Sequence, residues 1–180
     1  MTIASEQNVK FLILETGLGG RLDATRCAPA DLALLTSISL EHTDILGGEI
    51  NQIIKEKAAI ARPGKPILAR VMDTIDYQQT VESVAQNCYQ SLLDEEKRPA
   101  QCHFIDIPDG TTVRKEAHIL AEQALEILNQ KSILKDVDEL LNWPGRLQRI
   151  NLSSGHNLIL EAAHNPTGLE KIIPELINLI

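Results

Sequence analysis

Side chains that could do chemistry follow two apolar runs near the start of the chain. Glu15 follows the run at 9–14 and precedes the glycine-rich segment 17–20, and His42 follows the run at 31–38. Short aliphatic runs of this kind are typical of buried strands in a parallel sheet, whose carboxyl ends meet at one edge. We therefore expect a carboxylate and an imidazole at one sheet edge. Together they could hold a divalent metal whose other ligands are water and phosphate.

Both residues also have a purely structural explanation. Glu15 could cap the glycine-rich turn, and His42 could hydrogen-bond Asp44 within its loop. The turn does not match the GxGxxG fingerprint of dinucleotide sites, because Leu22 stands where the last glycine belongs. The phosphate-binding pattern GxxxxGK[ST] occurs nowhere in the 180 residues. The glycines alone therefore assign no ligand.

Lys57 stands out for its position on a predicted helix over 49–61. It lies seven, four and three residues after Ile50, Ile53 and Ile54, which places it on the apolar stripe of that helix. Desolvation favours the neutral amine of a lysine, and the neutral amine is the reactive form. The alternative is snorkelling, in which the stem is buried and the ammonium stays in water.

A third group of polar residues precedes the last predicted helix. Asn165 is a good N-cap and Pro166 a good first helical residue, which explains this pair without any function. His164 stands just ahead of the positive end of that helix, where it could meet an anion.

Composition excludes several classes of partner. The 17 basic and 25 acidic residues give a net charge of −8, which argues against a nucleic acid or an anionic membrane surface. Three widely spaced cysteines form neither a disulfide framework nor a metal clamp, which favours a reducing, cytoplasmic location. No apolar run reaches membrane-spanning length. Aromatic residues make up only 3%, so the core must be aliphatic.

Alternating strands and helices predict an α/β fold with a mostly parallel sheet. The predicted strands lie at 9–14, 31–38, 66–71, 102–107, 148–152 and 157–161. The predicted helices lie at 49–61, 76–93 and 113–131 and from Pro166 onward. For the helix over 113–131 the expected buried face consists of Ala117, Leu120, Ala121, Ala124, Leu125 and Leu128. Pro144 and Gly145 interrupt the pattern and indicate a linker, and both chain ends look like cuts through a longer pattern.

Five segments in order resemble folylpolyglutamate synthase/dihydrofolate synthase, a family of the Mur ligase superfamily. They are ETGLGGRLDAT (15–25), SISLEHTDILG (37–47), IIKEKAAIARPGKPIL (53–68), WPGRLQ (143–148) and LEAAHNP (160–166). The resemblance implies a P-loop ATPase domain, here its latter part at 1–142, and the start of a smaller C-terminal α/β domain at 143–180. It implies an ATP-dependent ligase that turns dihydropteroate or a folate's terminal glutamate into an acyl phosphate, which the amine of glutamate attacks.

The resemblance also implies a role for each matching residue. Glu15 and His42 match the residues that hold Mg²⁺ near the nucleotide phosphates, and His42 also belongs to the catalytic set. Lys57 matches the catalytic lysine that is carbamylated in this superfamily. Asp23 and Ala24 match positions that approach the pterin. Positions that contact ATP from the second domain match Arg146, Glu161 and His164.

The chain also departs from the family pattern. Family members usually carry Asp-His where Glu41-His42 stands, and Asp-Gly where Glu161-Ala162 stands. The P-loop expected before Glu15 is absent, and family chains are more than twice this length. We therefore expect an interior fragment that is inactive alone unless a second polypeptide supplies the P-loop. The competing hypothesis is a non-catalytic remnant or a metal- or pterin-binding module.

The expected two-domain organisation predicts the outcome of limited proteolysis. Mild digestion should cut the chain first near residues 140–149, because a linker between two folded units is the most accessible backbone. Mass spectrometry of the early fragments locates the cut. A chain that stays whole in this region while it is cut elsewhere would contradict the two-domain prediction.

Overall fold

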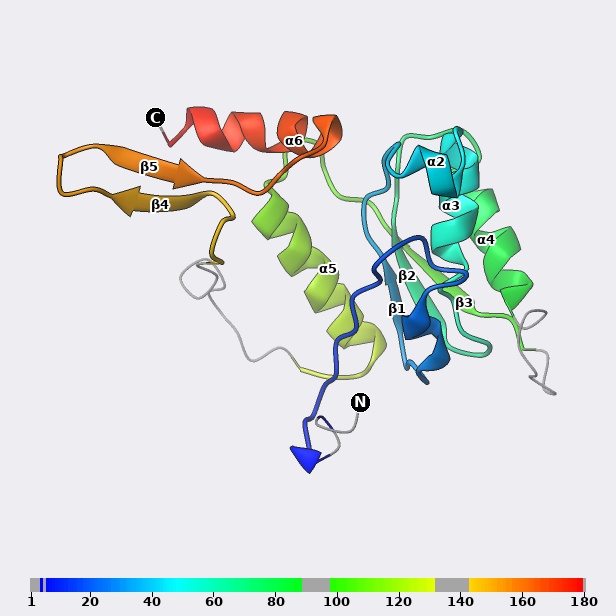
Figure 1. Cartoon of the computed structure of the whole chain (residues 1–180). Helices are drawn as coiled ribbons and strands as arrows, with labels where there is room; N and C mark the ends of the chain where they lie inside the picture. The colour runs from blue at the N-terminus through cyan, green and yellow to red at the C-terminus, as the bar shows by residue number, and fades with distance from the viewer. Residues whose placement is uncertain (1–3, 5, 89–97, 132–142, 180) are drawn as a thin grey trace.

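The structure is a computed structural model that describes residues 4, 6–88, 98–131 and 143–179 (Figure 1). In chain order its elements are the 3₁₀ helix η1 (Ala24–Cys27), β1 (Ala33–Leu35), α2 (Thr43–Leu46), α3 (Ile50–Ala58), β2 (Pro66–Arg70), α4 (Tyr77–Gln86), β3 (Gln101–Ile105), α5 (Val113–Ile127), β4 (Gln148–Asn151), β5 (Asn157–Leu160) and α6 (Pro166–Ile177). The predicted helix at 76–93 is confirmed as far as Gln86, and its last residues lie outside the described ranges.

The first three strands form one parallel sheet in the order β1-β2-β3. Ala33 pairs with Ile67 at the start of the first ladder, and Arg70 pairs with Ile105 at the end of the second. All three carboxyl ends therefore lie at one edge, which confirms the predicted α/β class with a parallel sheet. Strands β4 and β5 form a separate antiparallel pair. The two sheets share no strand, and the predicted boundary between 142 and 143 stays a prediction because residues 132–142 lie outside the described ranges.

Helices cover both faces of the parallel sheet (Figure 1). Successive side chains of a strand point to opposite faces, so Leu68 of β2 points away from its neighbours Ile67 and Ala69. Leu68 packs with residues of α5 on one face, and Ala69 packs with residues of α3 and α4 on the other. All three of these β2 side chains are fully buried.

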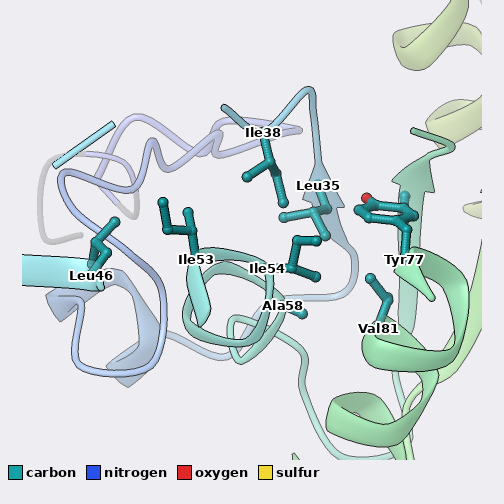
Figure 2. Packing of buried hydrophobic residues seen from close by; sticks show 9 residues of the cluster. Leu35, Ile38, Leu46, Ile53, Ile54, Ala58, Tyr77 and Val81 are labelled. Carbon is teal, nitrogen blue, oxygen red and sulfur yellow. The ribbon is translucent and has the colours of Figure 1, made fainter. Parts of the chain in front are cut away.

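Helix α3 forms the predicted stripe against the sheet. Ile53, Ile54 and Ala58 are fully buried, and Figure 2 shows them facing Leu35 and Ile38 from β1 and the loop after it. The helix starts with a capping box in which Glu49 and Gln52 satisfy each other's backbone amides. This packing fixes the rotation of α3 and therefore the direction in which Lys57 leaves it.

The predicted strand at 9–14 is wrong for the described structure. This segment forms no strand, and its apolar side chains are exposed, with Ile13 at 91%. An apolar run becomes a buried strand only when a neighbouring strand offers a hydrogen-bond ladder and other elements cover both faces. Within the described ranges the segment pairs with neither β1 nor any other strand. Glu15 therefore follows an extended stretch of coil.

The predicted buried face of α5 is only partly correct. Leu120 is buried, but Ala117 and Ala121 are exposed, and the carboxylate-bearing Glu116 is buried in their place. Ion pairs of Glu116 with Arg70 and Lys171 explain the difference, because paired charges make a buried glutamate tolerable. Sequence periodicity ranks a glutamate as exposed and cannot foresee its partners.

The described helices do not meet the requirements of a membrane span. None of them combines the length and the apolar character that crossing a membrane needs.

Candidate functional site

His42 lies at the start of α2, in the segment that follows β1. Its backbone is left-handed, with φ 51° and ψ 37°, and its ring makes no capping hydrogen bond. Such a conformation is uncommon for residues other than glycine and is found disproportionately at functional sites. The amide of Ile38 lies 3.2 Å from Sδ of Met72, so the segments after β1 and β2 are in contact at the carboxyl edge.

Lys57 reaches the residue that precedes His42. Its Nζ lies 3.0 Å from Oε1 of Glu41, and the two side chains are 21% and 27% exposed. The carboxylate offsets the cost of keeping a lysine on an apolar stripe. The helical periodicity singles out Lys57 but not its partner. Within the described ranges no hydrogen bond or ion pair joins Lys57 to Glu15 or His42.

The glycine-rich loop packs directly against the last turn of α3. A Cβ added to Gly20 would lie 2.6 Å from the carbonyl oxygen of Lys57 and 2.7 Å from that of Glu56, so only glycine fits there. The next residue, Arg21, donates its backbone N–H to the Glu56 carbonyl at 3.0 Å and its Nε–H to Oε1 of Glu56 at 2.8 Å. The loop is thus tied to the turn that carries Lys57.

Asp23 holds this loop in shape. Its Oδ2 accepts the backbone N–H groups of Gly17 at 2.9 Å and Leu18 at 3.2 Å. Its Oδ1 accepts the backbone N–H of Thr25 at 2.8 Å and the Thr25 hydroxyl at 2.6 Å. These hydrogen bonds, led by those from Thr25, lower the pKa of Asp23 to about 2. Both oxygens serve the loop itself, while Ala24 begins η1 and is exposed.

Arg62 joins η1 to the segment after α3 and was not foreseen from the sequence. The buried guanidinium donates to the carbonyl oxygens of Thr25 at 2.8 Å, Ala28 at 3.3 Å and Ile60. Burial lowers the pKa of Arg62. The only sequence signal for Arg62 is that a charged residue directly follows Ala61 on the predicted apolar stripe. Its partners are backbone carbonyl groups, which every residue type has, so residue types do not reveal them.

A second cluster forms where β5 leads into α6. Glu161 accepts the backbone N–H groups of Leu147 and Ala163, each at 2.8 Å, and pairs with Nη1 of Arg146 at 3.4 Å. Burial alone would raise the pKa of Glu161, but the hydrogen bonds from Ala163, Leu147 and Arg146 outweigh it and the pKa is lowered. The structure therefore brings together two of the three residues predicted to contact ATP.

The third such residue, His164, is exposed directly before α6. Its Nδ1 lies 3.1 Å from the carbonyl oxygen of Ala162. Asn165 caps the helix as predicted, accepting the N–H of Gly168 at 2.7 Å, and Pro166 is the first helical residue. The N-terminus of α6 thus begins beside His164.

The predicted metal ligands do not form a complete metal site by themselves. Glu15 and His42 are both exposed. Within the described ranges no group of three or more His, Cys, Asp or Glu side chains is arranged to hold a metal ion. A metal bound by either residue would have to complete its coordination with water or with ligand oxygens.

Comparisons with known proteins agree with this architecture. No family model matches the chain. The dihydrofolate synthase/folylpolyglutamate synthase of Bacillus subtilis is 35% identical over 94% of this chain and 45% of its own length. The enzyme of that name from Escherichia coli is 31% identical over 94% of this chain and 44% of its own length. The chain thus spans a little under half the length of these curated relatives.

Solved structures show the same relationship. The apo form of L. casei FPGS superposes with a TM-score of 0.73 at 19% identity, covering 99% of this chain and 49% of that one. An Escherichia coli protein solved with DHPP and ADP superposes with a TM-score of 0.66 at 26% identity, covering 92% of this chain and 42% of that one. The fold is that of the folylpolyglutamate synthases over the part that it spans. Over the part of them that it spans, the chain is similar in sequence and fold to the dihydrofolate synthase/folylpolyglutamate synthases.

The packing of the glycine loop predicts that alanine substitutions at two glycines change the free energy of unfolding by very different amounts. Gly20→Ala should destabilise the chain by about 1–3 kcal/mol, because the new methyl group meets two backbone carbonyls that cannot move aside. Gly48→Ala is the matched control, since nothing lies within 4 Å of a Cβ there. Urea unfolding measures both. Equal free energies of unfolding for the two variants would contradict the close approach of the loop to α3.

The hydrogen bonds of Asp23 predict a carboxyl group with a low pKa. Its contribution to stability is complete above about pH 4, the ordinary range of the group, and is lost as the pH falls through about 2. Thr25→Ala removes the hydroxyl donor and should raise this pKa, as followed by carbon-13 NMR of the carboxyl group. Thr43→Ala, at an exposed threonine of α2, should leave the pKa unchanged. An ordinary Asp23 pKa in the unsubstituted chain would contradict the loop geometry.

Proposed function

We propose that this chain carries part of the active site of an ATP-dependent ligase that adds glutamate to dihydropteroate or to a folate through an acyl phosphate. The observation that carries the proposal is the meeting of three segments: the glycine loop, the last turn of α3 with Lys57, and the Glu41-His42 pair that follows β1. Similarity to the synthases supports the choice of substrates, as do the DHPP and ADP bound in the Escherichia coli structure.

The first cluster suits the phosphate side of such a reaction. The ring of His42 is not used in capping and Glu15 is exposed, so both could serve as ligands of a hydrated Mg²⁺. When bound, Mg²⁺ would neutralise charge on the nucleotide phosphates. Lys57 is the proposed carbamylated lysine. Its carbamate would be an anion and would have to exchange Glu41 for a cationic partner.

The glycine loop and the second cluster suit substrate binding. Because both oxygens of Asp23 are engaged within the loop, we propose that Asp23 shapes the pterin-binding surface while the exposed Ala24 contacts the ligand. Arg146 and His164 are the proposed ATP contacts of the second cluster. Glu161 would act by orienting Arg146 and the turn at Leu147.

Catalysis also needs a phosphate-binding loop, and the 180 residues contain no GxxxxGK[ST] sequence. We propose that this loop is supplied by polypeptide outside these residues, either a second chain or a further part of the same protein. The cytoplasmic location expected from the cysteines likewise stays a prediction.

A complementation assay tests this function. The chain is mixed with the segments of the Bacillus subtilis relative that precede and follow the matched region, and phosphate release is followed with ATP, glutamate and dihydropteroate. We expect turnover in the mixture and none from any part alone. Lys57→Met should lower the turnover about 100-fold or more, the usual scale for a group that takes part in the chemistry. Lys55→Met, at an exposed lysine of the same helix, is the matched control.

Two results would overturn the proposal. Turnover by the 180-residue chain alone would show that no outside phosphate loop is needed. A mixture that binds a pterin by calorimetry but releases no phosphate would instead favour a non-catalytic binding module. Circular dichroism of each variant separates lost chemistry from lost folding.

A further inference from the structure

A buried carboxylate connects three elements on the side of the sheet covered by α5. Glu116 is only 5% exposed. Its Oε1 lies 3.2 Å from Nε of Arg70, the last residue of β2, and its Oε2 pairs with Nζ of Lys171 on α6. A carboxylate that is this well buried needs its charged partners, because an unpaired buried charge is costly.

The Lys171–Glu116 pair is one of two polar side-chain contacts that attach α6 to the earlier described residues. Between residues 143–179 and the described residues before them, the polar side-chain contacts are the Lys171–Glu116 pair and Glu175, whose Oε1 accepts the backbone N–H of Val113 at 3.0 Å. Ile172 of α6 is buried, but Leu169, Ile173 and Ile177 stay exposed. The helix is therefore not held by burial of its whole apolar face.

The position of this attachment relates the two clusters of the candidate site. Arg70 ends β2 at the carboxyl edge of the sheet, and α5 begins just after β3 reaches the same edge. Figure 1 shows α6 lying across that end of α5. Because α6 begins at the segment that holds Glu161 and His164, any tilt of α6 moves this segment relative to the sheet edge.

We propose that Glu116 is a positioning residue that pairs with Arg70 and Lys171 to dock α6, and with it the Glu161–His164 segment, over the carboxyl edge of the sheet. The docking is a property of this chain and does not need turnover. Its effect on ATP binding rests on the proposed function.

The chemistry of the three groups explains why the docking would be specific. Arg70 alone leaves half of a buried carboxylate without a cation, so Lys171 brings charge compensation only when α6 lies in place. A partly buried pair is also screened by salt less than a pair at the surface. Docking through Glu116 should therefore persist at moderate ionic strength.

Spin labels test the docking in the whole chain. They are placed on Gln78 of α4 and Ser154 of the β4–β5 turn, which are both exposed, through a keto-bearing amino acid that leaves the cysteines native. Electron-resonance distances should show one narrow population in the unsubstituted chain. Lys171→Met and Glu116→Gln should each lower the docked-to-undocked ratio about tenfold or more, since each removes one partner of a buried pair.

The controls distinguish positioning from general stability. Lys171→Arg should restore the narrow distance, and Lys115→Met, at the exposed neighbour of Glu116, should not change it. If Glu116→Gln unfolds the chain, the Lys171→Met variant decides the result. An unchanged narrow distance in Lys171→Met, or a broad distance in the unsubstituted chain, would overturn the proposal.

In the reconstituted ligase, Lys171→Met should raise the KM for ATP about tenfold with a smaller change in kcat, as expected when a binding segment is displaced. Equal KM values with a changed distance would refute the link to ATP binding. Failure of the mixture to turn over at all would count against the proposed function and leave the docking result standing.

Discussion

The contact on which the candidate site depends is the approach of Gly20 to the last turn of α3. With no side chain at this position, the loop backbone reaches the carbonyl groups of Glu56 and Lys57. The same turn sends Lys57 to Glu41, beside His42. The segments around Gly20, Glu41 and Lys57 are far apart in the sequence. One backbone contact joins the first to the third, and one ion pair joins the third to the second. A shift of the loop would move the lysine, and a rotation of α3 would displace both.

Packing of α3 against the sheet holds the contact between Gly20 and α3 in place. Ile53 and Ile54 are fully buried against β1 and the loop after it, so α3 has one rotational setting that buries its apolar stripe. Arg62 adds a polar connection by holding carbonyl groups of η1 and of the segment after α3 together. Apolar packing fixes the orientation of α3, and hydrogen bonds to carbonyl groups hold the glycine loop and η1 against it.

Local patterns predicted the parts of this structure that local interactions determine. Helix α3 follows from periodicity, strands β2 and β3 follow from short apolar runs, and the cap at Asn165 follows from residue type. Partners distant in sequence could not be predicted: Glu41 for Lys57, or Arg70 and Lys171 for Glu116. The apolar run at 9–14 was wrongly predicted as a strand. Its hydrophobicity favours burial but does not show whether a neighbouring strand is available to pair with it. The residues alone suggested a divalent metal at Glu15 and His42 and an anion at His164, and the assignment to Mg²⁺ and ATP came from the family resemblance.

The acidic residues near the two clusters explain how a chain with a net charge of −8 could meet a nucleotide. Asp23 is engaged by amide and hydroxyl donors, Glu41 by an ammonium group, and Glu161 by two amides and a guanidinium. Each negative charge is therefore largely compensated by donors from the protein itself. The N-terminus of α6 adds the positive end of a helix dipole next to His164. The local field that a phosphate would meet is set by these donors more than by the net charge of the chain.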